Sequence, residues 1–388
     1  MTNLKTISIF GATGSIGDSA ADVIQSAADR FDVVGVTAHR NAEKLAARAI
    51  ALRARKAVIA DEAQYEALKT ALSGTGIEVS AGQSALLDLA SERVDMSLMA
   101  IMGFAGLRPI MRAIEQGGAV AIANKEPLVA AGPFVMAAAA KYGATILPID
   151  SEHNAIFQVL EPQNKAAIDR IILTASGGPF RGFSKEQLAS VTLAQALKHP
   201  NWEMGAKITI DSATLTNKAL EVIEAHYLFD MPADQIDVII HPQSTIHSMV
   251  EYHDGSILAQ MGASDMRTPL SHVLNYPARL KTPGERLDLT ALTQLSFEQP
   301  DKDAFPTLGY AYDALGAGLY AQIALNAANE VAVAAFLADK CRFLDIMNCQ
   351  HHVLNGITKQ NISSLDDVEQ FDQHIRQMSQ SFLNKKAA

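Results

Sequence analysis

The sequence predicts an α/β protein with an N-terminal doubly wound parallel sheet, a second domain of α+β type and a C-terminal helical bundle. Three observations predict this. Short apolar runs alternate with amphipathic stretches through residues 1–149. The alternation stops in residues 150–275, and apolar residues recur at helical spacing in residues 302–388. Between the last two parts, residues 276–301 are rich in Pro and polar residues and are expected to be a linker.

The composition is that of an ordinary globular protein. Of 388 residues, 48% are apolar and 19% are charged, and the net charge is −10. The negative charge and the lack of a Lys/Arg run argue against a nucleic-acid partner. Every long apolar stretch is interrupted by Lys, Glu or Pro, so we expect no membrane span. The first residues lead directly into a strand, so we also expect no signal peptide. Two cysteines, Cys341 and Cys349, far from the motifs below, favour the reducing cytoplasm.

A glycine motif follows the first strand. Residues 7–10 form an apolar strand, residues 11–17 read Gly-Ala-Thr-Gly-Ser-Ile-Gly, and an apolar helical pattern follows. In this context glycines let the backbone approach a pyrophosphate, and the helix N-terminus supplies amide donors. The sequence therefore predicts a Rossmann-like dinucleotide site. The alternative is a tight strand–helix turn without a ligand.

The second strand, residues 33–37, ends before His39, Arg40 and Asn41. NAD enzymes commonly place an acid at this point to bind the ribose 2′-hydroxyl. Arg40 instead suits a 2′-phosphate, so the sequence favours NADPH over NADH. A surface arginine without a ligand is the alternative.

The alternation continues and should give a mostly parallel sheet with ligands beyond the carboxyl ends of its strands. Lys125, after the last of these strands, is expected to meet a phosphate or a substrate oxygen; alternatively Asn124 caps a helix with Glu126 in its first turn. The expected strands are residues 57–59, 77–79, 96–101 and 119–123, and the expected helices are residues 64–72 and 107–116.

An acidic motif follows the apolar strand at residues 144–147: Asp150, Ser151, Glu152 and His153. In an extended chain the side chains of Asp150 and Glu152 point to the same side, and two like charges at one point call for a cation. A strand that ends in a solvated acidic turn is the alternative.

The next segment offers groups for a phosphate and a lid. A strand at residues 170–174 enters Ser176 and a Gly-Gly-Pro turn, which either binds phosphate or is a plain turn. The loop at residues 197–205 holds the only Trp, Trp202, either as part of a lid or packed into the domain. A strand at residues 207–210 and a helix at residues 211–224 should follow. Strands at residues 236–240 and 244–251 suit an antiparallel sheet, with one face exposed or paired with a second subunit.

Asn217, Lys218 and Glu221 share one face of the expected helix. This face is either a solvated stripe with an ion pair or part of the acidic site. In the second case Glu221 joins Asp150 and Glu152 as a third oxygen ligand, and the other two bind a phosphate. Ligation by carboxylates alone suits Mg²⁺ or Mn²⁺ and not zinc. Further helices, expected at residues 308–337, 343–360 and 366–383, should only support the domain interface.

Taken together, these motifs closely resemble the 1-deoxy-D-xylulose 5-phosphate reductoisomerase family over nearly the whole chain. The matching blocks are residues 11–17, 124–126, 150–153, 176–181, 199–205, 211–221 and 325–331. The resemblance implies a homodimer that uses NADPH and Mg²⁺ or Mn²⁺. It implies conversion of 1-deoxy-D-xylulose 5-phosphate to 2-C-methyl-D-erythritol 4-phosphate in non-mevalonate isoprenoid synthesis. Residues 1–149 would bind NADPH, and residues 150–275 would be the catalytic and dimerisation domain.

The resemblance also implies roles for single residues. Metal ligands would be Asp150, Glu152 and Glu221, and these with Lys125 and His153 would be catalytic. Substrate would contact Lys125, Ser151, Glu152, Ser176, His199, Trp202, Met204, Ser212, Asn217, Lys218 and Glu221. NADPH would contact Thr13, Gly14, Ser15, Ile16, Gly17, His39, Arg40, Asn41, Asn124, Glu126 and Gly205. His39 departs from the small residue expected at that position.

Two other functions are compatible with a dinucleotide-binding domain. A semialdehyde dehydrogenase needs a nucleophilic cysteine after that domain, but Cys341 and Cys349 lie in the expected helical bundle. A regulator that binds NADPH without catalysis is expected to have lost acids or phosphate ligands, and here all are present. An assay of metal-dependent NADPH oxidation with deoxyxylulose phosphate separates the three.

Overall fold

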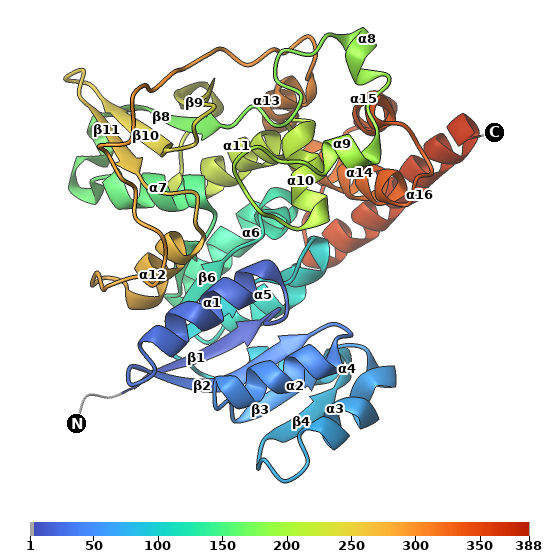
Figure 1. Ribbon diagram of the computed structural model, residues 1–388. Helices are drawn as coiled ribbons and strands as arrows, with labels where there is room; N and C mark the ends of the chain where they lie inside the picture. The colour runs from blue at the N-terminus through green and yellow to red at the C-terminus, as the bar shows by residue number, and fades with distance from the viewer. Residues whose placement is uncertain (1–3, 388) are drawn as a thin grey trace. The chain divides into compact units, whose positions relative to one another are not determined.

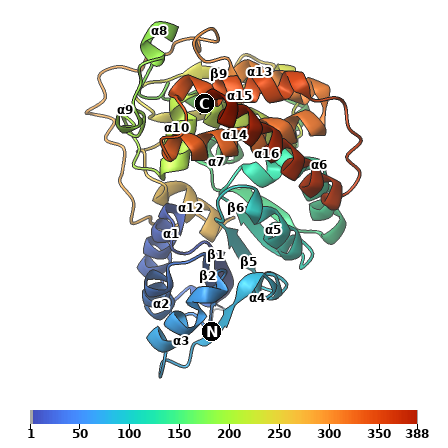
Figure 2. The same ribbon diagram turned by 90° about the vertical axis from the view of Figure 1, so that its right-hand side faces the viewer.

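The computed structural model describes residues 4–387, which form two compact units (Figures 1 and 2). The first unit comprises the chain up to Pro127, Val135–Asn154 and Asp265–Glu285; the second comprises Leu128–Phe134, Ala155–Ser264 and the chain from Arg286 onward. The domain limits expected from the sequence stay a prediction. The expectation of no signal peptide falls partly on residues 1–3, outside the described residues.

Seven parallel strands form the sheet of the first unit, in the order β4-β3-β2-β1-β5-β6-β7. The chain runs outward from β1 to β4 and then resumes on the other side of β1, so the predicted doubly wound sheet is confirmed. The reversal lies beside the end of β1, where the glycine motif follows. The strands are β1 (Lys5–Phe10), β2 (Phe31–Ala38), β3 (Lys56–Ile59), β4 (Glu78–Ala81), β5 (Met96–Met99), β6 (Ala119–Ile122) and β7 (Thr145–Pro148).

Helices connect these strands. The sequence did not predict α2, α4 or α12; of these, α4 connects β4 at the edge of the sheet to β5 beside β1, and parallel strands need such a crossover. In both views α12, from the segment expected to precede the linker, lies beside α1, where Arg267 contacts Asp22 at 3.9 Å (Figures 1 and 2). The helices are α1 (Ser15–Ser26), α2 (Ala42–Ala51), α3 (Tyr65–Ala71), α4 (Gly82–Ala90), α5 (Leu107–Ile114), α6 (Glu126–Tyr142) and α12 (Arg267–Asn275).

The second unit has a sheet of mixed direction, in the order β11-β10-β8-β9. Its strands are β8 (Ile168–Ala175), β9 (Ile236–Ile240), β10 (Ile246–Tyr252) and β11 (Ile257–Met261). The expected antiparallel pairing is correct for β10 with β8 and wrong for β9, which is parallel to β8. Parallel pairing is open to β8 and β9 because several helices connect them. The edge strand β11 was not predicted.

Residues 207–210, expected to form a strand, are helical. Here α10 (Ala206–Ala213) ends in a turn, and α11 (Thr216–Phe229) follows. Apolar Ile208 and Ile210 alternate with polar neighbours, a pattern typical of a strand. In the fold, however, Ile210 and Ala213 are both buried, as expected of residues three apart on one helix face.

The C-terminal helices are confirmed, with one break at Gly318, whose φ is 115°. They are α13 (Thr307–Ala317), α14 (Leu319–Leu337), α15 (Phe343–Gly356) and α16 (Leu365–Ala387). Three of them, α14, α15 and α16, share a buried apolar core with α10 that includes Ile210, Ala213, Ala324, Ala328, Val333, Phe343, Ile346 and Ile375. The bundle is therefore part of the second unit. Among the described residues no helix is long and apolar enough to cross a bilayer.

Candidate active site

The glycine motif folds as a tight turn between β1 and α1. Gly11 has a φ of +90°, and a Cβ there would lie 2.4 Å from the backbone oxygen of Ala100. A Cβ on Gly17 would lie 2.5 Å from the carbonyl carbon of Ala12. Gly14 is the N-cap of α1 and supplies no side-chain acceptor, so the first amides of α1 point outward without a side-chain partner. With the positive end of the helix dipole, they form a site suited to a phosphate.

The end of β2 lies beside this turn, because the backbone amide of Gly11 donates to Thr37 Oγ1 at 3.0 Å. His39, Arg40 and Asn41 follow, all exposed. The Arg40 side chain is 72% exposed and lies 3.3 Å from Asp61 Oδ2, so its remaining donors are open to a ligand. The Asn41 side chain accepts from the backbone amide of Lys44 at 2.9 Å and caps α2.

Lys125 is buried at the carboxyl end of β6, where its Nζ lies 3.0 Å from Asp150 Oδ2. It is the N-cap of α6, so the alternative expectation of a cap at Asn124 is wrong, although Glu126 does lie in the first turn. β6 and β7 are parallel neighbours whose carboxyl ends lie at one edge of the sheet, and this brings Lys125 and Asp150 together.

Asp150 begins a helix instead of extending a strand. It precedes α7 (Ser151–Val159), and its Oδ1 accepts from the backbone amides of Glu152 at 3.1 Å and His153 at 3.4 Å. The expectation that Asp150 and Glu152 alternate along an extended chain is therefore wrong, since an acid that caps a helix satisfies its first amides. The buried His153 ring has Nδ1 3.5 Å from Asp150 Oδ1, and Ser151 Oγ donates to Glu152 Oε2 at 2.9 Å.

On α11 the predicted face is buried. Glu221 is completely inaccessible; it accepts from Asn217 Nδ2 at 2.5 Å and from the ammonium group of Lys218, itself buried. The three side chains share one helix face, as predicted, but this face is not a solvated stripe. A carboxylate with no access to water keeps its charge only beside donors or a cation.

Ser176 and His199 form a second polar pair in this unit. The Ser176 Oγ lies 2.9 Å from His199 Nε2 and accepts from the backbone amide of Gly178 at 3.1 Å. His199 Nδ1 faces the backbone amides of Asn201 at 3.2 Å and Trp202 at 3.0 Å, and must accept from them. Hence Nδ1 carries no proton, and the proton on Nε2 is donated to Ser176. Burial lowers the pKa of His199 to about 4, so the ring is neutral near pH 7.

The segment around Trp202 is a loop, as predicted. Asn201 Nδ2 donates to the carbonyl oxygen of Pro242 at 2.6 Å and to Ser244 Oγ at 2.9 Å. The half-buried Trp202 ring lies 5.9 Å from the His247 ring, measured between centroids. These contacts fix the loop against the connection between β9 and β10. Met204 is half-buried and Gly205, the N-cap of α10, is exposed.

The expected site residues fall in both units. The first unit brings together Lys125, Asp150 and His153, and the second holds one cluster on α11 and another at Ser176 and His199. The expected metal ligands divide between the units, with Asp150 and Glu152 in the first and Glu221 in the second. Their common binding of one ion stays a prediction.

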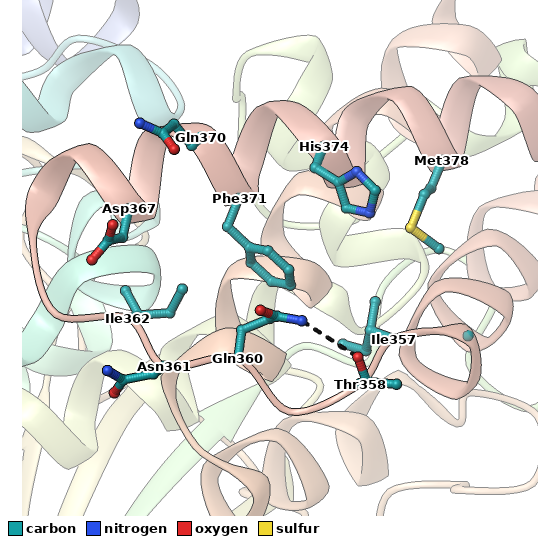
Figure 3. A pocket seen from close by; sticks show the side chains of 11 residues that line it. Ile357, Thr358, Gln360, Asn361, Ile362, Asp367, Gln370, Phe371, His374 and Met378 are labelled. Carbon is teal, nitrogen blue, oxygen red and sulfur yellow. Dashed lines mark hydrogen bonds between the residues drawn. The ribbon is translucent and has the colours of Figure 1, made fainter.

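A cavity of about 390 Å³ lies between the end of α15 and α16 (Figure 3). Ile357, Phe371, His374 and Met378 are among its lining residues, and none of the expected site residues lines it. The candidate site is therefore defined by its polar side chains and not by this cavity.

Family models match the chain in three consecutive blocks. One described as 1-deoxy-D-xylulose 5-phosphate reductoisomerase matches residues 7–132, and one described as the C-terminal domain of that enzyme matches residues 146–229. A third, described as the DXP reductoisomerase C-terminal domain, matches residues 261–378.

Curated relatives are similar over the full length. The 1-deoxy-D-xylulose 5-phosphate reductoisomerase of Zymomonas mobilis is 49% identical over 376 residues, which cover 97% of each chain. That of Nitrobacter winogradskyi is 48% identical over 389 residues, covering 99% of this chain and 96% of the relative.

Solved reductoisomerase structures are also similar to this chain. The Zymomonas mobilis reductoisomerase in complex with NADPH superposes with a TM-score of 0.93 at 47% identity, over 98% of this chain and 99% of that one. A DOX-P reductoisomerase in complex with NADPH, fosmidomycin and magnesium superposes with a TM-score of 0.95 at 41% identity, over 98% of each chain.

Proposed function

The chain belongs to the 1-deoxy-D-xylulose 5-phosphate reductoisomerase family, and we propose how its own residues serve the reaction of that family. The enzyme converts 1-deoxy-D-xylulose 5-phosphate to 2-C-methyl-D-erythritol 4-phosphate with NADPH and a divalent metal ion. The observation that carries this assignment is the match to reductoisomerases over 97% of the chain. The reaction places the enzyme in isoprenoid synthesis, by the non-mevalonate route.

The cysteines argue against the dehydrogenase alternative. Burial raises the pKa of Cys341 to about 12 and that of Cys349 to about 11. A nucleophilic cysteine must be a thiolate at neutral pH, and both thiols are held protonated. Both also lie in or beside the C-terminal helices of the second unit, away from the glycine turn along the chain.

The glycine turn of the first unit fits NADPH. Glycine is required at residues 11 and 17 by backbone collisions, whereas a Cβ at Gly14 would have its nearest neighbour 3.7 Å away, in space that a pyrophosphate can use. Arg40 lies beside this turn for the 2′-phosphate. We propose that NADPH is bound by Thr13, Gly14, Ser15, Ile16, Gly17, His39, Arg40, Asn41, Asn124, Glu126 and Gly205. When bound, NADPH supplies the hydride.

Oxygen donors fit Mg²⁺, and Mn²⁺ as a substitute. We propose Asp150, Glu152 and Glu221 as its ligands. Asp150 and Glu221 are buried carboxylates, each next to a buried lysine, Lys125 and Lys218 respectively. Each lysine places a positive charge beside its carboxylate, which favours the charged form that ligation of a hard cation requires. A bound divalent ion supplies Lewis acidity toward the substrate oxygens.

Other side chains bind and orient the substrate. Ser176 presents its hydroxyl hydrogen to a phosphate oxygen while the neutral His199 donates its Nε2 proton to the Ser176 oxygen, and Lys218 adds a positive charge. Contacts to this remote group position the reacting carbons. We propose Ser212 and Asn217 as further phosphate contacts, and Lys125, Ser151, Glu152, His153 and Glu221 as residues around the reacting oxygens. The loop with Trp202 and Met204 excludes water from the reaction.

Two copies should associate through β11. Within residues 4–387 this edge strand pairs only with β10, and its exposed residues include Ile257 at 51% and Leu258 at 39%. An unpaired edge with apolar side chains is suited to pairing with another strand. We propose a cytoplasmic homodimer formed in this way.

The proposal is tested by NADPH oxidation with the purified enzyme and 1-deoxy-D-xylulose 5-phosphate, with the product identified by nuclear magnetic resonance. We expect 2-C-methyl-D-erythritol 4-phosphate to form one-to-one with NADP⁺. NADPH oxidation without this product, or no oxidation with Mg²⁺ or Mn²⁺ present, would refute the assignment.

A further inference from the structure

The second unit contains a buried polar cluster that the site described above does not include. All of its members are less than 3% exposed, although they lie among the Ala, Leu and Val side chains of α10, α11 and the C-terminal helices. Buried polar groups cost free energy unless they are hydrogen-bonded, so one hydrogen-bonded arrangement of these side chains is favoured over the others. Its members are Asp211, Thr214, Thr216, Thr307, Asn329 and Gln350.

Asn329 and Gln350 connect the C-terminal helices to α10 and α11. Asn329 Nδ2 on α14 donates to Asp211 Oδ1 on α10 at 2.7 Å. Gln350 Nε2 on α15 donates to Asn329 Oδ1 at 2.9 Å and to Thr216 Oγ1 at 3.3 Å. The other oxygen of Asp211 accepts from Lys207 Nζ at 2.8 Å. Both oxygens of this buried carboxylate thus have donors, one of them charged.

These contacts converge on the turn between α10 and α11. Leu215 in this turn has a φ of 58°, a left-handed conformation that non-glycine residues rarely adopt. Such a residue persists where its surroundings fix the backbone from several sides. Here Thr307 Oγ1 donates to the carbonyl oxygen of Thr214 at 2.8 Å, the backbone amide of Thr216 donates to Thr214 Oγ1 at 3.3 Å, and Gln350 contacts Thr216.

The turn separates the residues assigned to the phosphate. Ser212 lies on α10 before it, and Asn217 and Lys218 lie in the first turn of α11 after it. The relative direction of these side chains therefore depends on the conformation of the turn. We propose that Asn329 and Gln350 are positioning residues that hold the α10–α11 turn so that the three side chains converge on the substrate phosphate. This inference rests on the proposed function.

The inference gives the C-terminal helices a role that the sequence did not suggest. Apolar side chains at residues 329 and 350 would fill the same space, and in many cores such replacements are tolerated. The amides are needed because they direct hydrogen bonds to Asp211 and Thr216. Their loss should therefore affect binding of the phosphate more than folding.

The test compares Asn329→Leu and Gln350→Met with the wild-type enzyme on two substrates. With 1-deoxy-D-xylulose 5-phosphate, kcat/KM should fall about tenfold in each variant, mainly through KM, as expected when one or two buried hydrogen bonds are lost. With the phosphate-free sugar 1-deoxy-D-xylulose, kcat/KM should equal that of the wild type. Fluorescence titration should show unchanged NADPH affinity.

Matched variants separate positioning from general packing. Ser379→Ala removes a buried hydroxyl of α16 that donates to the Ile375 carbonyl oxygen at 2.8 Å, outside the cluster, and should leave both substrates unaffected. Thr307→Val keeps the shape of its side chain and removes only the contact to Thr214, so it provides the same test if Asn329→Leu does not fold. Asp211→Asn retains an acceptor for Asn329, so its kcat/KM with the phosphorylated sugar should fall less than that of Asp211→Leu.

The outcomes are distinguishable. A fall of kcat/KM with the phosphorylated sugar alone supports the inference. Equal losses with both sugars in a folded variant overturn it while the proposed function stands. If the wild-type enzyme itself converts neither sugar, the proposed function fails and the inference fails with it.

Discussion

At the scale of single residues, the charges of the candidate site occur as buried pairs. Asp150 lies 3.0 Å from Lys125, and Glu221 contacts Lys218 and Asn217. Removing one partner of a buried pair leaves an uncompensated charge, at a cost of about 3–5 kcal/mol. These residues therefore affect the stability of the fold as well as the reaction, and variants at these positions must conserve the shape of the side chain. Amide replacements of the acids conserve shape but remove the charge beside the buried lysine, so the Tm of each variant is measured together with its activity.

Arg40 should determine the choice of cofactor. Arg40→Ala is expected to raise KM for NADPH about tenfold and to leave KM for NADH unchanged, because a charge-assisted hydrogen bond contributes about 1.5–3 kcal/mol. Steady-state kinetics with both cofactors measure this. Arg112→Ala, which removes another exposed arginine of the first unit, is the control. A wild-type preference for NADH would contradict the interpretation of Arg40.

His199 should make the fold sensitive to acid. Burial lowers its pKa from 6.5 to about 4, so between these values the unfolded chain binds a proton that the folded chain does not. The contribution of the neutral His199 side chain to the free energy of unfolding is complete above pH 6.5 and is lost as the pH falls toward about 4. His199→Asn should therefore show a smaller fall of Tm between about pH 7 and pH 5 than the wild type. Parallel Tm curves would exclude this role; His272, with a similarly lowered pKa, remains in both proteins.

At the scale of elements, the turn before α1 separates two reasons for a glycine. In Gly17→Ala the new Cβ would lie 2.5 Å from backbone of Ala12, and such overpacking should destabilise the fold by about 1–3 kcal/mol. In Gly14→Ala the Cβ has space, so Tm should not change, but it would stand where the pyrophosphate is proposed to bind. Thermal melting and NADPH titration of the two variants measure this. A Gly14→Ala protein with normal NADPH affinity would contradict the proposed site.

Strands and helices were predictable from the sequence where one hydrophobic pattern dominated the segment. The apolar runs of β1 to β7 and the glycine turn gave the first sheet correctly, because buried parallel strands are continuous apolar segments. Residues 207–210 were predicted wrongly because their alternation is typical of a strand, and four residues do not reveal the three-residue spacing that buries Ile210 and Ala213 on one helix face. The geometry expected for the acidic motif was wrong: Asp150 caps α7, and a capping acid and the acid at the end of a strand have the same local sequence. The roles of its residues stay a prediction.

Contacts between distant segments were not predictable. Asn329 and Asp211 are separated by 118 residues, and nothing local to either suggests the hydrogen bond between them. The sequence signal was the amides Gln322, Asn326 and Asn329 in a largely apolar helix. A polar residue at a buried position indicates a partner without identifying it.

At the scale of the whole molecule, β11 should determine the oligomeric state. Leu258→Asp places a charge on the exposed edge strand and should shift the dimer toward monomer, because like charges would face each other across a two-fold interface. Analytical ultracentrifugation measures the change. Leu289→Asp, at another apolar residue that is 64% exposed, is the control and should stay dimeric. A wild-type monomer at micromolar concentration would rule out the proposed dimer.

The division of the proposed metal ligands between the two units leads to the central claim. Asp150 and Glu152 belong to one unit and Glu221 to the other, so a single bound ion would connect residues far apart in the chain. The amide of Glu221→Gln is a poor ligand for a hard cation. We expect this variant to lose at least about 100-fold in kcat while NADPH affinity is retained, since metal assistance contributes several kcal/mol. Glu251→Gln, at a partly exposed acid of the same unit, should retain full activity.

The most direct test is a Mg²⁺ titration of the chelator-treated enzyme, followed by turnover of 1-deoxy-D-xylulose 5-phosphate with saturating NADPH. The account predicts no turnover without metal, saturable recovery with Mg²⁺ in the wild type, and recovery shifted to much higher Mg²⁺ concentration or absent in Glu221→Gln. Full turnover after chelation, or identical Mg²⁺ titrations for the wild type and Glu221→Gln, would contradict it.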